Sequence, residues 1–207
     1  MNGYKTLRGP ASAELTEKRS VFICRVRPVT TEAQALAFLA EVRKQCADAR
    51  HNVYAYTIRE NGIARFSDDG EPHGTAGLPT LDALRKRGIV DAAAVTTRYF
   101  GGVLLGTGGL VRADSQAAAM AVEQAGVAEM AACAFFSFTV GYADYPRVQA
   151  LADRSPALRI ERTAFGDGVT VSASAREEAL PAVQTALRDA LGGRISFADG
   201  GRGYAEV

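Results

Sequence analysis

The chain has 207 residues, of which 47% are hydrophobic and 23% charged, and its 24 basic and 23 acidic side chains give a net charge of +1. This composition excludes a chain that is disordered throughout, and it excludes a uniformly cationic coat for nucleic acid. The sequence holds no apolar run long enough to span a membrane, and residues 1–20 hold no apolar core of a secretory signal. We therefore expect a cytoplasmic protein of one or two domains with no membrane partner.

The first part of the chain alternates strands and helices. Strands are predicted over 21–26, 51–58 and 92–98, and helices over 31–46, 79–87 and about 110–124. Thr31 and Gln34 form a capping box at the start of the first helix. The buried face of that helix is predicted to comprise Leu36, Leu39, Val42 and Cys46. Between the second strand and the second helix, the segment 67–77 (SDDGEPHGTAG) is rich in turn residues.

The last third predicts the order β-α-β-β-α-β. Alternating apolar residues indicate strands at 136–142, 158–160, 169–171 and 195–197, and helices follow Pro146 and a capping box formed by Ser174 and Glu177. This order is that of a ferredoxin-like domain. We therefore predict two α+β domains, spanning residues 1–133 and 134–207.

The three cysteines form no motif. Cys24, Cys46 and Cys133 are odd in number, and no two of them stand in a C-x-x-C pair. The pattern excludes a disulfide framework or a thiolate zinc site built from this chain alone. We expect reduced and mostly buried thiols, without a catalytic nucleophile.

Nine of the 21 glycines lie between Gly70 and Gly109, and they concentrate in the segment 96–118 (TTRYFGGVLLGTGGLVRADSQAA). This segment is predicted to run from a strand through a glycine loop into a helix. Glycines let backbone N–H groups point to one side, and a helix N-terminus attracts anions, so the turn is a candidate site for a phosphate or carboxylate. Arg98 and Arg112 would add charge-assisted hydrogen bonds. The alternative is that the glycines only allow close packing and that both arginines pair with acidic neighbours. The spacing matches neither a P-loop nor a dinucleotide fingerprint.

The turn-rich segment 67–77 carries Asp68, Asp69 and Glu71, with His73 close behind. Three carboxylates and an imidazole are suitable ligands for a divalent cation, but their spacing fits no calcium loop. We favour a second interpretation, in which the carboxylates pair with Arg98 or Arg112 and anchor the glycine loop. No metal or cofactor is therefore expected.

Two further groups of residues have a structural and a functional interpretation. His51 begins a strand, where a histidine is more often held by a hydrogen bond than used as a general base. Four aromatic residues are able to stack on nucleic-acid bases, although core packing accounts for at least half of them: Tyr54, Tyr56, Tyr99 and Phe100.

Three blocks of sequence together resemble the YigZ/IMPACT family: DARHNVYAY at 48–56, SDDGEPHGTAGLP at 67–79 and TRYFGGVLLGTGGLVRA at 97–113. The resemblance implies an N-terminal domain similar to the second domain of a small-subunit ribosomal protein. It also implies a ferredoxin-like C-terminal domain similar to one in elongation factor G. Eukaryotic members of the family are regulators of translation that restrain the activation of an initiation-factor kinase. The family has no agreed catalytic residues, and Asp114 stands where its motif commonly has tyrosine.

Together these observations predict a non-catalytic, translation-associated regulator. Its N-terminal domain would bind RNA, ribosomal components or a protein partner. The alternative is an enzyme or sensor that takes a nucleotide or another small phosphorylated ligand. The candidate ligand-binding residues are His51, Asp68, Asp69, Glu71, Arg98, Gly101, Gly102, Gly106, Thr107, Gly108, Gly109 and Arg112.

Overall fold

The computed structural model describes residues 3–193 and 195–206 of the chain. The chain divides into two compact units, described separately below. The N-terminal unit spans Tyr4–Glu129, and the C-terminal unit runs from Met130 onward and includes Gly3. The division falls within strand β7 (Val127–Val140), four residues before the boundary predicted at residue 133. Because this strand continues through the division, no turn or linker marks it in the sequence.

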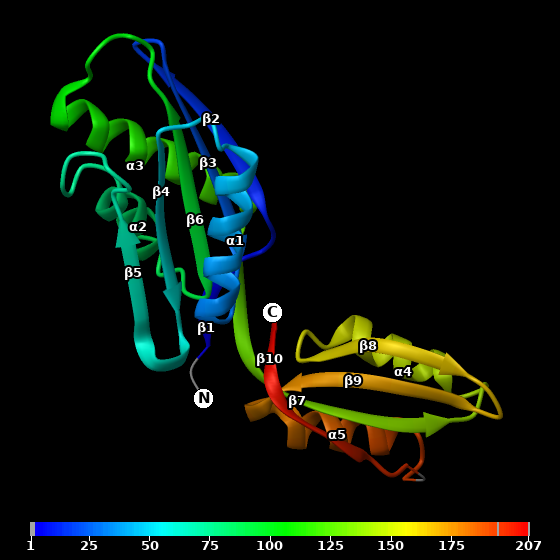
Figure 1. The fold of residues 1–207 in the computed structure, drawn as a ribbon. Helices are drawn as coiled ribbons and strands as arrows, with labels where there is room; N and C mark the ends of the chain where they lie inside the picture. The colour runs from blue at the N-terminus through cyan, green and yellow to red at the C-terminus, as the bar shows by residue number, and fades with distance from the viewer. Residues whose placement is uncertain (1–2, 194, 207) are drawn as a thin grey trace. The chain divides into compact units, whose positions relative to one another are not determined.

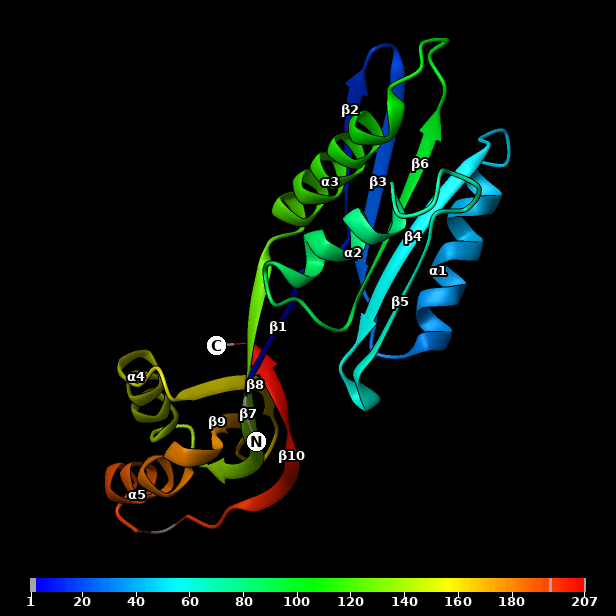
Figure 2. The same cartoon turned by 90° about the vertical axis from the view of Figure 1, so that its left-hand side faces the viewer.

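The N-terminal unit is built on a five-stranded antiparallel sheet with the order β2-β3-β6-β4-β5. Helices α2 and α3 cover one face of this sheet and α1 covers part of the other (Figures 1 and 2). The strands are β2 (Ala11–Glu17), β3 (Ser20–Pro28), β4 (His51–Ile58), β5 (Ile63–Ser67) and β6 (Ala92–Tyr99). The helices are α1 (Glu32–Gln45), α2 (Gly77–Arg85) and α3 (Gly106–Ala125), and the short strand β1 (Tyr4–Leu7) pairs with β7. The predicted strands β3, β4 and β6 are thus confirmed, whereas β1, β2 and β5 were not predicted.

Helix α1 begins as predicted, and its buried face differs from the predicted one at Leu36. The Thr31 hydroxyl accepts a hydrogen bond from the Gln34 N–H at 3.2 Å, and the Gln34 side chain accepts one from the Thr30 N–H at 2.8 Å. Leu36 is 48% exposed, so its predicted burial is wrong, whereas the predicted burial of Leu39, Val42 and Cys46 is confirmed. The buried stripe also includes Ala35 and Phe38. Two apolar stripes overlap on this helix, and only its packing against β4 and β6 selects between them.

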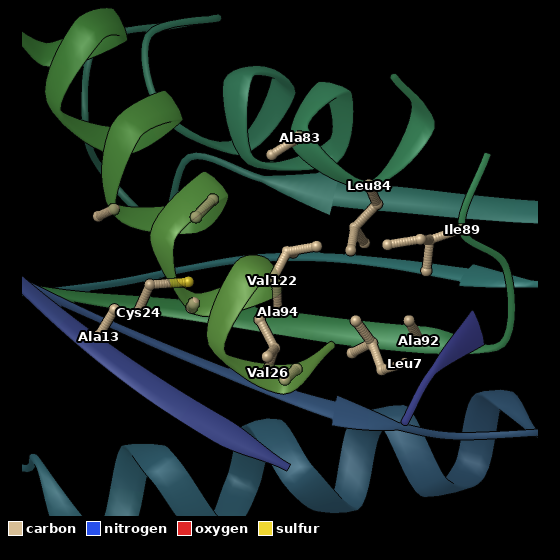
Figure 3. Packing of buried hydrophobic residues seen from close by; sticks show 14 of the residues in the cluster. Leu7, Ala13, Cys24, Val26, Ala83, Leu84, Ile89, Ala92, Ala94 and Val122 are labelled. Atoms are coloured by element: carbon tan, nitrogen blue, oxygen red, sulfur yellow. The ribbon is translucent and has the colours of Figure 1, made fainter. Parts of the chain in front are cut away.

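Helix α3 begins at Gly106, four residues earlier than predicted, so Gly106, Thr107, Gly108 and Gly109 form its first turn. Glycine is a poor helix former, which is why local propensity places the start after the last glycine. The turn is held instead by the rest of the helix, whose buried residues pack on the sheet. Figure 3 shows this core, with Val122 of α3 and Leu84 of α2 lying against Val26 and Ala94 of the sheet.

The C-terminal unit confirms the predicted ferredoxin-like order. Its antiparallel strands follow one another as β10-β7-β9-β8, with β8 (Leu158–Phe165), β9 (Val169–Arg176) and β10 (Ala198–Glu206). The helices are α4 (Tyr145–Arg154) and α5 (Leu180–Ala190). The predicted capping box is wrong, because Ser174 lies in β9 and its hydroxyl donates to Glu161 at 2.6 Å. The last strand, β10, begins after the predicted range 195–197. Its glycine-rich sequence has little strand propensity, so the sequence does not indicate this position.

The architecture is therefore α+β with two domains. None of the helices in the described part of the chain is both long and apolar enough to cross a membrane.

Candidate functional site

Asp68 closes the turn-rich segment on itself. Its carboxylate accepts three backbone N–H groups, from Gly74 at 2.8 Å, Ala76 at 3.1 Å and Gly77 at 2.8 Å. Two of these donors lie at the start of α2, where helical N–H groups have no partner within the helix. Burial by itself would raise the pKa of Asp68, but the three hydrogen bonds outweigh it and hold this pKa below its ordinary value. Asp68 therefore acts as the cap of α2.

Asp69 joins the same turn to α1 and β4. Its carboxylate accepts the Asn52 N–H at 2.7 Å and forms an ion pair with Arg43 at 2.6 Å. Its carbonyl oxygen lies 2.9 Å from Nδ1 of His51. A carbonyl only accepts hydrogen bonds, so Nδ1 carries the proton, and Nε2 is left 3.9 Å from the Glu71 carboxylate. His51 is thus held in one orientation.

Glu71 and Arg98 form a buried ion pair. Nη1 of Arg98 donates to the two Glu71 oxygens at 2.6 and 2.9 Å, and the side chains are 3% and 10% exposed. The guanidinium also lies 5.5 Å from the ring of Phe22 and 5.7 Å from that of Phe100. Glu71 therefore pairs with Arg98 in the manner that the anchoring interpretation of the acidic turn predicts. Removing either partner would leave an uncompensated buried charge, which is strongly unfavourable.

Asp114 of α3 lies in the protein interior close to this pair. It is 1% exposed, and burial, followed by the nearby Glu71 carboxylate, raises its pKa to about 8. Asp114 is therefore mostly protonated at neutral pH and adds little negative charge near the glycine-rich segment. Within the described residues, three buried atoms have no hydrogen-bond partner: Oδ2 of Asp114, Nε of Arg98 and Oγ1 of Thr96.

The glycine-rich segment has a different character from the acidic turn. The Gly101 N–H donates to the Ser20 hydroxyl at 3.1 Å, and a Cβ at residue 101 would lie 2.0 Å from the Arg19 carbonyl carbon, so only glycine fits there. Gly102 and Gly106 have positive φ angles of 81° and 70°. No side chain caps the first turn of α3, which contains Thr107, Gly108 and Gly109.

A cavity of about 430 Å³ opens in the N-terminal unit between the segments that precede β4 and follow β6. Among the predicted residues, His51 and Arg98 line it. The other lining residues are Asp48, Ala49, Arg50, Tyr99, Phe100 and Leu104. Phe100 is 54% exposed and Leu104 82%. Tyr54 and Tyr56, by contrast, pack in the core beneath α1, so the four candidate stacking residues divide between core and cavity.

Four exposed basic residues lie near the cavity and the glycine-rich segment, and we call them the basic rim: Lys18, Arg19, Arg50 and Arg112. None of them makes an ion pair with a described residue. The Lys18–Arg19 turn packs against Gly101, Arg50 lines the cavity, and Arg112 lies over the first turn of α3. Sequence reasoning selected only Arg112, because the others come from segments distant in the chain.

The candidate residues therefore fall into three groups. Asp68, Asp69 and Glu71 are occupied by partners within the chain, and His51 and Arg98 reach the cavity from that network. The glycine-rich segment and Arg112 lie at the surface. Among the described residues, no group of three or more His, Cys, Asp or Glu side chains is placed to hold a metal ion together.

Comparisons with known proteins match both units. Residues 18–122 match the model of the Impact N-terminal domain, and residues 138–194 match a domain of unknown function, DUF1949. The chain is 31% identical to an IMPACT family member of Haemophilus influenzae over 90% of this chain and 93% of that protein. It is 43% identical to the IMPACT family member YvyE of Bacillus subtilis over 62% of this chain, and the match spans 60% of that relative's length. A solved structure described as a hypothetical protein has a TM-score of 0.62 and 28% identity, covering 95% of this chain and 97% of its own.

Proposed function

Because the chain belongs to the IMPACT family, we propose that it is a non-catalytic regulator of translation that binds RNA, free or within the ribosome, at the basic rim. The observation that carries this proposal is the basic rim itself, in which four exposed cations have no acidic partner among the described residues. The chain as a whole has a net charge of only +1, so this local excess is a feature of one surface.

The rim surrounds groups that suit a nucleic acid strand. Lysine and arginine side chains bind phosphates and release their counterions, which favours binding at low salt, and exposed aromatic rings stack on unpaired bases. Phe100 stands among the rim residues and is about half exposed. The family resemblance adds that eukaryotic members regulate translation, which makes RNA a fitting partner.

The arrangement of His51 supports a binding role. Its Nδ1 is bonded to the Asp69 carbonyl, its Nε2 lies 3.9 Å from the Glu71 carboxylate, and none of its described contacts is a nucleophile that it could activate. A second candidate function is docking of a protein partner, which the exposed Leu104 and Val103 favour.

A salt-dependent titration tests the proposal. Labelled single-stranded RNA is titrated with the protein at two salt concentrations and followed by fluorescence anisotropy. Four neutralised phosphates on a single strand predict that log affinity falls with log salt with a slope of about −3. The double variant Arg50→Ala/Arg112→Ala should bind more weakly, with the slope reduced to about half.

The matched control is the double variant Lys86→Ala/Arg87→Ala. These two exposed bases precede β6, so they lie at the opposite end of that strand from Phe100. The control should bind RNA as the natural chain does. If the natural chain binds no RNA at low salt, or if both double variants lose affinity equally, the rim is not an RNA-binding surface. If a protein partner is then retained by the natural chain and not by Arg50→Ala/Arg112→Ala, the second candidate function, docking of a protein partner, is favoured.

A further inference from the structure

The cavity beside the basic rim combines apolar walls with a fixed hydrogen-bond donor. Tyr99, Phe100 and Leu104 supply the aromatic and aliphatic surface, and the exposed tenth of the Arg98 side chain lines the same space. Its volume of about 430 Å³ lies within the range of roughly 300–1,000 Å³ typical of small-ligand pockets. The volume is sufficient for a small ligand, and the rings of Tyr99 and Phe100 suit a planar one.

The pairing of Arg98 with Glu71 decides what kind of chemical group fits the cavity. Both hydrogen bonds that it donates to described residues leave from Nη1 and go to Glu71, so its positive charge is already compensated. A phosphate brought to this guanidinium would also meet the Glu71 carboxylate and be repelled by it. The remaining N–H donors instead suit a neutral acceptor, such as a carbonyl oxygen.

His51 provides the complementary group. It pairs directly with Arg98 across β4 and β6, so the two side chains lie on the same face of the sheet. Because Nδ1 donates to the Asp69 carbonyl, the acceptor lone pair of the ring lies on Nε2, and the Glu71 carboxylate, 3.9 Å away, is beyond hydrogen-bond distance of that nitrogen. The cavity thus places a donor beside an acceptor. The matching edge is a carbonyl next to a ring N–H, as in uracil and guanine.

We propose that this cavity binds one unstacked keto base, uracil or guanine, of a single-stranded RNA, with Phe100 stacked on its face and Arg98 donating to its carbonyl oxygen. This inference rests on the proposed function. The basic rim holds the phosphates that flank the base, because the charges of the rim have no acidic partner. The charge of Arg98 is already compensated by Glu71. A duplex is not accommodated, because its base edges and faces are already paired and stacked.

Two oligoribonucleotides of equal length, one of uridine and one of cytidine, test the proposal. The two probes have the same backbone and differ only where a keto base differs from an amino base. We expect the uridine probe to bind about tenfold more tightly, because one well-placed pair of base contacts discriminates by that order. The variant Phe100→Leu keeps an apolar side chain but removes the ring, and should weaken binding of the uridine probe about tenfold. It should leave the salt slope unchanged, because no phosphate contact is lost.

The matched control is Phe165→Leu, which removes an aromatic ring that is 66% exposed in the C-terminal unit. This variant should bind the uridine probe normally. Suppose that both probes bind equally and that Phe100→Leu has no effect, while Arg50→Ala/Arg112→Ala still loses affinity. Binding of a base in the cavity is then refuted, and the proposed function stands. If the natural chain binds neither probe, both proposals fail.

Discussion

The acidic turn at 67–77 and residues 100–112 of the glycine-rich segment are both candidate sites by sequence, yet they differ in what the fold does with their polar groups. In the acidic turn, each of the three carboxylates has partners within the chain. In the glycine-rich segment, Leu104 is 82% exposed and Arg112 makes no ion pair with any described residue. A polar group whose hydrogen bonds are satisfied internally holds the fold together, whereas one left unsatisfied at the surface is available to a ligand.

The same contrast explains why the cavity lies where it does. The acidic turn holds His51 and Arg98 in place through hydrogen bonds, and the glycine-rich segment contributes Phe100 and Leu104 to the cavity that these two residues line. Rigid support and exposed contact surface are thus contributed by different segments. The predictions below test this division of roles.

The largest effect is expected at the buried ion pair. Arg98→Met should lower the free energy of unfolding by about 3–5 kcal/mol, because it leaves the Glu71 carboxylate buried without a partner. The double variant Arg98→Met/Glu71→Met should recover most of that loss, since an apolar pair replaces an ionic one. Urea unfolding of the natural chain and the variants measures both effects. Equal stability of the natural chain and Arg98→Met would contradict the structural role of the pair.

The next effect concerns Asp114 and pH. Its raised pKa, about 8, means that the folded chain binds a proton that the unfolded chain releases near pH 4. The contribution of Asp114 to stability should therefore fall as the pH rises from about 4 to about 8, by up to about 1.4 kcal/mol per pH unit. Asp114→Asn, which cannot ionise, should lack this decline. Denaturant unfolding of both proteins across this pH range measures the difference, and parallel pH profiles would refute the assignment.

A smaller effect is expected at the cap of α2. Asp68→Ala should lower the free energy of unfolding by about 1–3 kcal/mol at neutral pH, because three backbone N–H groups lose their acceptor. The pKa of Asp68 is lowered in the folded state, so its contribution is present above the unfolded pKa of about 3.9 and is lost as the pH falls through the folded value. Thermal unfolding should show the gap between variant and natural chain closing in acid. A gap that stays constant down to the lowest pH would argue against the ionised cap.

The smallest effect distinguishes two glycines within the glycine-rich segment. Gly108→Ala should raise stability by about 0.5–1 kcal/mol, because alanine favours the helix and its Cβ would meet only Arg112 at 3.6 Å. Gly101→Ala is the contrasting variant, since its Cβ would overlap the Arg19 backbone. It should therefore lower stability. Thermal unfolding of the two variants tests this, and a loss at both positions would mean that the first turn of α3 is also tightly packed.

Part of the candidate site could be predicted because its signals are local. The favoured interpretation of the acidic turn was that its carboxylates pair with Arg98 or Arg112; it is confirmed for Glu71 with Arg98, and it is wrong for Asp68 and Asp69, which bind backbone N–H groups and Arg43. His51 and Arg98 were both selected as site residues. Asp68, Asp69 and Glu71 were selected as ligand-binding residues too, but their oxygens are directed to partners within the chain. A binding role for any of these residues remains a prediction. The cavity itself was not predicted, because its walls come from two segments that are distant in the chain, one at the start of β4 and one at the end of β6.

The amino-acid sequence by itself determined the α+β class, the ferredoxin-like order of the C-terminal unit and the start of α1. These depend on periodicity and on hydrogen bonds between residues a few positions apart. Tertiary structure alone decided that Phe38 rather than Leu36 is buried on α1, that α3 begins at a glycine, and that the Lys18–Arg19 turn lies against Gly101. The physical reason is that strand order joins distant segments, and their packing energy outweighs local conformational preferences of a few tenths of a kcal/mol up to about 1 kcal/mol per residue.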